Sequence, residues 1–161
     1  MSEPSLRIGY KLLGLRERKA MVSVPTLAEG EKSFSADWQF EADFRMRTES
    51  LLEIIIYASA TQRNQEEEGL LLHFELSHTF GLSKEHAIAE VLETKDASHK
   101  QFMFLATLTG ICLGTVRGLI FARTVGVIGP SLFMPVVYPD KLLKYFLERD
   151  KGEDEEGTRS K

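Results

Sequence analysis

The chain has 161 residues, which is enough for one domain with its own hydrophobic core. Its apolar and charged fractions, 43% and 27%, are typical of a soluble protein, and its net charge of −4 gives no electrostatic reason to expect a nucleic-acid partner. The single cysteine, Cys112, excludes a disulfide within one chain and lies in an apolar stretch, where a buried thiol is expected. The first residues lack the basic-then-apolar pattern of a signal peptide, so we expect a cytoplasmic protein.

Residues 6–15 are predicted to form a first strand, in which two glycines indicate a bulge or bend. The basic residues 16–19 are expected at its solvated end, and the polar residues 27–33 are expected to form a loop. At the far end of the chain, an acidic run over 153–156 predicts a disordered charged tail over 150–161, after a single domain over 1–149.

Three further strands are predicted in the first half of the chain. Residues 36–47 alternate apolar and polar side chains, which indicates one buried and one solvated face. Residues 51–61 are rich in β-branched side chains, and residues 70–80 place most of their apolar side chains on one face. The links are too short for crossover helices, so the pattern excludes a doubly wound parallel sheet and predicts four antiparallel strands in a meander.

A long helix is predicted over residues 98–124. Ser98 and Gln101 have the spacing of a capping box, and apolar residues then recur every three or four positions. Gly126 is expected to adopt the left-handed turn that ends the helix, and Gly129-Pro130 prevents its continuation.

A second short helix is predicted from Asp140, and residues 83–94 are expected to form either a short helix or an ordered crossover. The order of elements predicts an α+β fold. Its expected architecture is a four-stranded antiparallel sheet packed against a long C-terminal helix, followed by the second short helix.

The long helix could be considered a membrane span, but two features argue against stable insertion. Arg117 and Arg123 interrupt the apolar window, and glycines weaken a solitary helix. Gly110, Gly114 and Gly118 lie at four-residue intervals on one helix face, where another backbone could approach closely. We therefore expect a soluble helix that packs on a sheet or on a second copy of the chain.

No residue pattern for catalysis or metal binding is present. The chain lacks nucleophile-elbow, phosphate-loop, dinucleotide-binding and HExxH motifs. Its histidines, which we expect to be exposed or hydrogen-bonded, lack ligand partners at metal-binding spacing; they are His73, His78, His86 and His99. Glu41 and Asp43 are followed by arginines, which favours a solvated ladder of ion pairs. We expect no catalytic residue, no metal and no cofactor, and therefore not an enzyme.

Residues 125–137 form an unusually apolar connection between the two C-terminal helices. Most connections run over the surface and are polar, so this one requires an explanation. Either the core or a second subunit covers it, or it lines an exposed groove for a client polypeptide.

The order of these segments resembles the SecB family of protein-export chaperones. The segments that carry the resemblance are DWQFEADFRM (37–46), LLEIIIYASAT (51–61), LLHFELSHTFGL (71–82), RGLIFARTVG (117–126) and GPSLFMPVVYPDKLLKYFL (129–147). They span most of the chain, and their combination in this order is more specific than any one of them.

The resemblance implies an ATP-independent holdase that binds unfolded preproteins in apolar grooves and passes them to the SecA motor. It also implies a homotetramer, a dimer of dimers with the long helices between the sheets. By position, the candidate peptide-binding residues are Trp38, Phe40, Leu76, Phe80, Ile128, Leu132, Phe133 and Met134. The candidate residues for contact between copies are Gly110, Gly114, Arg117, Gly118 and Phe121.

Two alternatives remain open from the sequence. The strand around His73 lacks the acidic residues that the family presents to SecA, and relatives of the fold hold an antitoxin in toxin–antitoxin systems. The chain could thus be a dedicated chaperone of one such partner. It could also be a non-catalytic protein that binds a small lipophilic ligand in its apolar groove.

Overall fold

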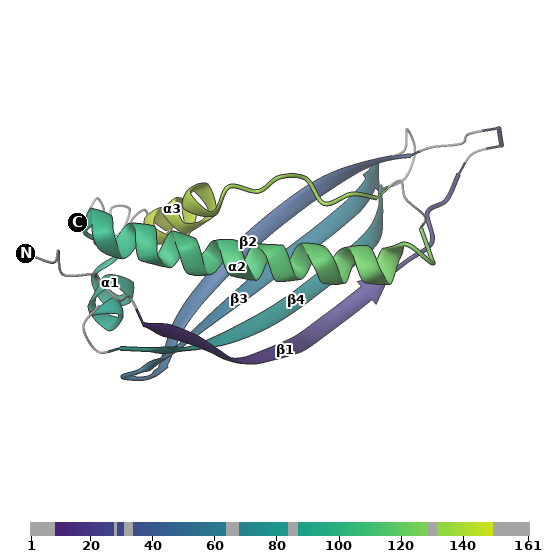
Figure 1. Ribbon diagram of the computed structural model, residues 1–161. Helices are drawn as coiled ribbons and strands as arrows, with labels where there is room; N and C mark the ends of the chain where they lie inside the picture. The colour runs from purple at the N-terminus through teal and green to yellow at the C-terminus, as the bar shows by residue number, and fades with distance from the viewer. Residues whose placement is uncertain are drawn as a thin grey trace, which may run out of the picture.

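The computed structural model describes residues 9–27, 29–30, 34–63, 68–83, 87–128 and 132–149. They form a four-stranded antiparallel sheet and three helices, which confirms the predicted α+β class (Figure 1). The strands are β1 Tyr10–Val22, β2 Ser35–Thr48, β3 Leu51–Arg63 and β4 Glu68–Leu82. The helices are α1 Ile88–Thr94, α2 His99–Thr124 and α3 Pro139–Arg149. The expected tail over 150–161 lies outside the described residues.

The strand order is β1-β4-β3-β2, so the predicted meander of four strands is wrong for β1. Strands β2, β3 and β4 are neighbours in sequence order, but β1 pairs with β4, with Tyr10 opposite Leu82 and Val22 opposite Leu72. Residues 23–34 therefore connect one edge of the sheet to the other. The alternation within each strand fixes its faces but not its neighbour, so the sequence pattern did not determine this choice.

Strand β1 is longer than predicted and includes the basic residues 16–19 within its paired length rather than at its end. Its register against β4 shifts twice, between Leu12 and Gly14 and between Glu17 and Lys19. The first shift confirms the irregularity predicted at Gly14. Such bulges increase the local twist of an edge strand.

Helix α2 begins at the predicted cap. The N–H of Gln101 donates to Ser98 Oγ at 3.3 Å, and the N–H of Ser98 donates to Gln101 Oε1 at 3.0 Å, which completes the capping box. The predicted left-handed turn at Gly126 is wrong, because its φ is not positive. Instead, the N–H of Ile128 donates to the carbonyl oxygen of Thr124 at 2.8 Å, and this turn closes the helix end.

Helix α2 lies across one face of the sheet and forms the main core with it (Figure 1). The even-numbered positions of β3 point toward the helix. The side chains buried between the two layers include Ile54, Ile56, Leu105, Leu108, Cys112 and Ile120. Burial raises the pKa of the Cys112 thiol far above its ordinary value, which agrees with the buried thiol expected from the sequence.

The side of α2 that faces away from the sheet is also apolar. Among the described residues, α2 is the one helix long and apolar enough to cross a membrane, yet half of its most apolar window is buried inside the protein. On the outer side, Met103 and Phe121 are 50% and 53% exposed. The sheet therefore buries one side of this helix and leaves apolar side chains exposed on the other side.

His78 is buried on the helix-facing side of β4, contrary to the expectation of an exposed or hydrogen-bonded histidine. Its side chain is fully buried, and neither ring nitrogen has a well-aligned hydrogen-bond partner within the described part of the chain. Burial lowers the pKa of His78 to about 4, and interactions with the backbone of Ile54 and Leu76 offset only part of that effect.

The buried His78 should make stability depend on pH. The unfolded state binds a proton near the ordinary pKa of 6.5 and the folded state only near 4, so its contribution is complete above pH 6.5 and is lost as pH falls toward 4. Replacement His78→Leu should remove about 2 kcal/mol of the loss of unfolding free energy between pH 7.5 and pH 5. Urea denaturation of both proteins at several pH values measures this, and equal pH profiles would contradict it.

Candidate functional site

The segment 132–138 lies between α2 and α3 in the chain (Figure 1). Two open, mostly apolar grooves lie beside this segment. The first, which we call the β2 groove, has a volume of about 450 Å³ and is lined by Trp38, Phe40, Pro135, Val136, Val137, Tyr138, Lys141, Leu142 and Tyr145. The second, the α2 groove, has a volume of about 360 Å³ and is lined by Gly114, Arg117, Gly118, Ile120, Phe121, Leu132, Phe133 and Met134.

Alternation along β2 produces the aromatic wall of the β2 groove. Trp38 and Phe40 are two residues apart, so both point to the same side of the sheet, and their rings stack with centroids 5.6 Å apart. Tyr138 and Tyr145 are each more than half exposed on the opposite wall. Lys141 Nζ lies 4.9 Å from the centre of the Tyr138 ring and is the one charged group among the described residues that line this groove.

The α2 groove has a floor of glycine and walls of phenylalanine. Gly114 and Gly118 are one turn apart, and a Cβ atom added at either would meet nothing within 4 Å. Phe121 and Phe133 are 53% and 63% exposed, so both present large apolar surface to the groove. Arg117 Nη2 donates to the carbonyl oxygen of Pro135 at 3.0 Å, which ties the connecting segment to the helix.

The segment 132–138 separates the two grooves because some of its side chains enter the core and others remain at the surface. Leu132 and Met134 are buried, whereas Phe133 and Val136 are 63% and 71% exposed. Both explanations of this apolar connection therefore apply within one subunit, since part of it enters the core and part remains open.

Five of the eight candidate peptide-binding residues line one or other of the two grooves, and the other three do not. Trp38 and Phe40 line the β2 groove, and Leu132, Phe133 and Met134 line the α2 groove. Ile128 is partly buried against the core and lines neither groove, and Leu76 and Phe80 lie in the core beneath α2.

The burial of two of these candidates has a structural cause. Leu76 and Phe80 share a sheet face with Trp38 and Phe40, but α2 covers the middle of that face and leaves the part of β2 around Trp38 and Phe40 open. The exposed tyrosines of the β2 groove were missed, although their spacing of seven residues across the start of α3 was visible in the sequence.

The glycine row of α2 serves two different contacts. A Cβ atom added at Gly110 would lie 3.3 Å from Pro139 Cγ, so this glycine admits the start of α3 rather than a second subunit. The other candidate interface residues, Gly114, Arg117, Gly118 and Phe121, are exposed and line the α2 groove.

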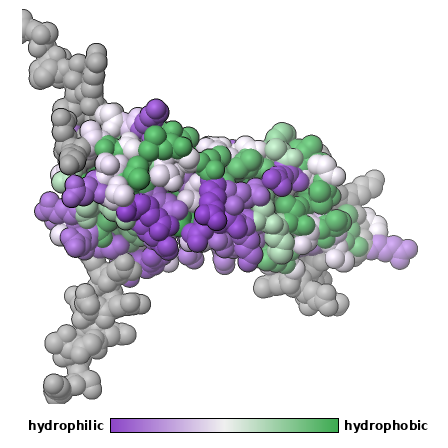
Figure 2. Space-filling model, turned by 90° about the horizontal axis from the view of Figure 1, so that it is seen from below, coloured by the Kyte–Doolittle hydropathy of each residue, from purple (hydrophilic) through white to green (hydrophobic). Residues whose placement is uncertain are grey.

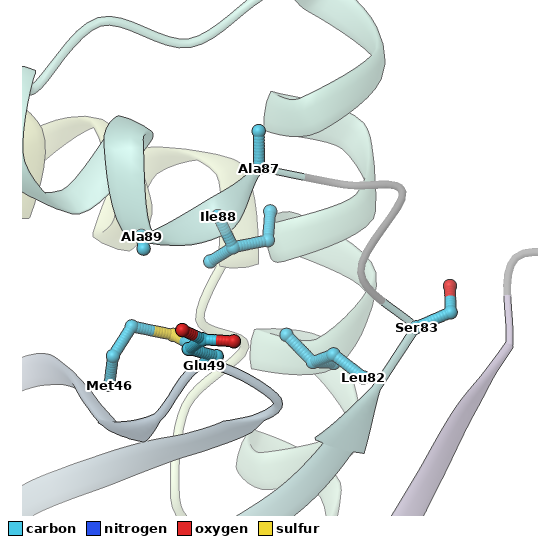
Figure 3. A pocket seen from close by; sticks show the side chains of 7 residues that line it. All are labelled: Met46, Glu49, Leu82, Ser83, Ala87, Ile88 and Ala89. Atoms are coloured by element: carbon cyan, nitrogen blue, oxygen red, sulfur yellow. The ribbon is translucent and has the colours of Figure 1, made fainter.

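A third pocket, of about 190 Å³, lies between the ends of β2 and β4 and the start of α1. The side chains of Met46, Glu49, Leu82 and Ile88 converge on it (Figure 3). Among the described residues that line it, Glu49 carries the one ionisable side chain. Within the described ranges, no group of three or more His, Cys, Asp or Glu side chains could hold a metal ion.

Comparison with known proteins supports the fold. No protein-family model matches the chain, and no curated protein matches it either. Among solved structures, it is similar to the Mycobacterium tuberculosis Rv1957 SecB-like chaperone in complex with a ChAD peptide from the Rv1956 HigA1 antitoxin. The identity is 15%, the TM-score is 0.56, and the match covers 80% of this chain and 90% of that one.

A second solved structure, a protein of unknown function from Streptococcus agalactiae, is similar with a TM-score of 0.37 and 11% identity, over 79% of this chain and 98% of that one. That score is too low to support an argument. The similarity to the SecB-like chaperone confirms the predicted resemblance, and at 15% identity it establishes the fold alone.

The two environments on the glycine row predict different responses to alanine. Gly118→Ala adds a methyl group in open space and should stabilise the helix by about 0.5–1 kcal/mol, which corresponds to a rise in Tm of about 1–4 °C. Gly110→Ala has the same helix propensity gain but pushes on Pro139, so its Tm should rise less or fall. Thermal unfolding at low protein concentration measures both, and equal stabilisation would disprove the packing role of Gly110.

Proposed function

We propose that this protein is an ATP-independent holdase chaperone that binds extended segments of non-native polypeptides in its apolar grooves. The observation that carries the proposal is the pair of open grooves flanking the segment 132–138, whose walls expose Phe121, Phe133, Val136 and two tyrosines. A small-ligand protein would be expected to enclose its ligand and to converge several polar groups on it, and these grooves are open and nearly all apolar.

Apolar contact suits the recognition of unfolded chains. Burying one large apolar side chain yields about 1.5–3 kcal/mol, and this energy depends little on the sequence of the client. A few such contacts give useful affinity and also allow release, without a nucleotide cycle. Met134 adds an adaptable side chain to the wall of the α2 groove.

Removing the exposed groove side chains should weaken client binding. The double variant Phe133→Ser, Val136→Ser should lose affinity for an unfolded client by about tenfold or more, because both side chains lie on the groove walls. The measurement is suppression of aggregation of three unrelated denatured proteins, at stoichiometric chaperone and without ATP.

A matched control is available because Val24 and Val136 are both 71% exposed and only Val136 lines a groove. The variant Val24→Ser, Leu27→Ser should therefore suppress aggregation as the native protein does, because both side chains are exposed and neither lines a groove. Equal loss in both variants would show that surface hydrophobicity in general, and not the grooves, is responsible. Failure of the native protein to protect any client would contradict the holdase function.

We also propose a homotetramer, a dimer of dimers, that uses the apolar outer side of α2. This assembly would cover Met103 and Phe121, which the sheet leaves exposed. Four of the residues proposed for this contact, Gly114, Arg117, Gly118 and Phe121, also line the α2 groove, so the second copy would add a further wall to that groove.

Particle mass tests the assembly. Light scattering should give about 73 kDa, four times the 18.2 kDa of the chain, and Phe121→Glu should lower it by placing a charge in an apolar contact. The variant should keep its helical circular dichroism, because Phe121 points outward from the folded subunit. A native protein that remains a monomer at high concentration would refute the proposed assembly.

The second candidate function is a dedicated chaperone of one partner, such as an antitoxin. The favourable observation is that the solved SecB-like chaperone of the same fold is in complex with a peptide from an antitoxin. Affinity purification that recovers one dominant partner encoded beside its gene, together with no protection of unrelated clients, would favour this function.

If the protein is instead the general holdase proposed first, we propose that it acts in the cytoplasm in protein export. SecA is then its candidate downstream partner.

A further inference from the structure

The β2 groove differs from the α2 groove because its aromatic walls carry polar atoms. Four of the described residues that line it are aromatic: Trp38, Phe40, Tyr138 and Tyr145. Among the described residues, those that line the α2 groove include two phenylalanines and no aromatic ring with a polar atom. Within the described part of the chain, the indole N–H of Trp38 and the hydroxyl groups of both tyrosines have no hydrogen-bond partner. The β2 groove therefore offers unused hydrogen-bond donors to an occupant.

One wall of the β2 groove is a single face of α3. Tyr138, Lys141 and Tyr145 are three and four residues apart, which places them on the same side of a helix. The N–H of Leu142 donates to the carbonyl oxygen of Tyr138 at 3.2 Å, so the first helical turn starts at Tyr138. The two tyrosines are then separated by a rise of about 10 Å along the helix, with Lys141 between them.

The other wall is formed by two parallel rings of β2. The planes of Trp38 and Phe40 differ by 3°, and both side chains are partly buried against the core. Each ring therefore restricts the movement of the other. A wall that is already ordered loses little entropy on binding, and the total loss is smallest when the ligand is also rigid.

The unused donors favour an occupant whose backbone carbonyl groups are free. A helical client engages its carbonyl groups internally, and an extended strand needs a second backbone to satisfy them. A polyproline II segment has no internal hydrogen bonds, so its carbonyl oxygens can accept from side-chain donors. Its turn of three residues rises about 9 Å, close to the separation of Tyr138 and Tyr145 along α3. Prolines three residues apart would thus contact both rings.

Lys141 gives the β2 groove a positive charge. Its Nζ lies 4.9 Å from the centre of the Tyr138 ring and forms no ion pair within the described part of the chain. Asp140 is next to it in sequence but is not among the lining residues. Lys144 lies outside the groove and pairs with Glu148 at 3.9 Å. An acidic side chain between two prolines of a client would therefore be attracted to Lys141, and a basic one would be repelled.

Other charges of the subunit are remote from this groove. Asp37 and Glu41 alternate with Trp38 and Phe40, so they point to the opposite face of the sheet. The strand order β1-β4-β3-β2 places β1 at the far edge. Seen from below, on the side where β1 lies in Figure 1, the surface is hydrophilic across its middle (Figure 2). Three strand spacings, about 14 Å, exceed the screening length at physiological salt. Lys141 is thus the charge that acts on an occupant.

We propose that the β2 groove selects client segments in the polyproline II conformation that carry an acidic side chain between prolines three residues apart. The aromatic walls hold the proline rings, the tyrosine hydroxyl groups donate to client carbonyl oxygens, and Lys141 Nζ pairs with the client carboxylate. Lys141 is therefore the residue that sets the charge preference of the groove. This inference rests on the proposed function, because it names the class of client that one of the two grooves prefers.

The test uses the full chain and the fluorescence of Trp38, which is the single tryptophan of the sequence and lines the β2 groove. A tryptophan-free peptide of about twelve residues that repeats Pro-Glu-Val has the required turn of three residues. Its titration should change the Trp38 emission saturably. The Pro-Lys-Val peptide should bind about tenfold more weakly, because one attraction becomes a repulsion. The Ala-Glu-Val peptide should also bind about tenfold more weakly, because it is less preorganised.

Three variants assign the roles of the groove residues. Lys141→Glu should reverse the charge preference, so that the Pro-Lys-Val peptide binds more tightly than the Pro-Glu-Val peptide. The matched control Lys144→Glu makes the same charge change on the same helix outside the groove and should keep the native preference. The double variant Tyr138→Phe, Tyr145→Phe keeps both rings but should bind the Pro-Glu-Val peptide about fivefold more weakly, because two donors are lost.

Several results would overturn this inference. Equal affinity for the glutamate and lysine peptides, or the same reversal in Lys144→Glu, would exclude selection by Lys141. Equal binding of the alanine peptide would exclude selection of the polyproline II conformation. A native protein that suppresses aggregation but shows no change in Trp38 emission with any peptide would disprove the inference and leave the holdase function intact. Selective peptide binding without protection of any client would instead contradict the holdase function alone.

Discussion

The packing of an all-round apolar helix on one face of a four-stranded sheet is the constraint on which the rest of the structure depends. The inner side of α2 buries Leu105, Leu108 and Cys112 against β3 and β4 and provides the core. Its outer side, with Met103 and Phe121, gains nothing from that contact. A helix of this kind stabilises the subunit and at the same time leaves apolar surface that only another polypeptide can cover.

The segment 132–138 shapes part of this exposed apolar surface into two grooves. It runs beside α2, and Leu132 and Met134 enter the core while Phe133 and Val136 remain outside. The hydrogen bond from Arg117 to the Pro135 carbonyl oxygen holds its middle, and the absence of a side chain at Gly110 leaves room for Pro139 just after its end. Two grooves result from one ordered connection, and most of the described side chains that line them are apolar.

The face of the sheet opposite α2 is governed by electrostatics rather than by burial. Arg47 and Ser77 hold Glu53 in its charged form despite its burial, and Arg63 pairs with Asp37 across β2 and β3 at 2.7 Å. The cations of β1 lack such partners among the described residues. Lysine and arginine on an edge strand disfavour unselective strand pairing.

The sequence by itself determined the elements with strong local signals. The capping box at Ser98, the alternation of β2 and the period of α2 each depend on neighbours a few residues apart, and so did the α+β class that follows from their order. Only the tertiary structure decided which strand β1 joins and which part of the apolar sheet face α2 covers. The position of α2 in turn makes Leu76 and Phe80 core residues, while Trp38 and Phe40 line a groove. Periodicity assigns a side chain to a face, but whether that face is covered depends on where a distant helix comes to lie.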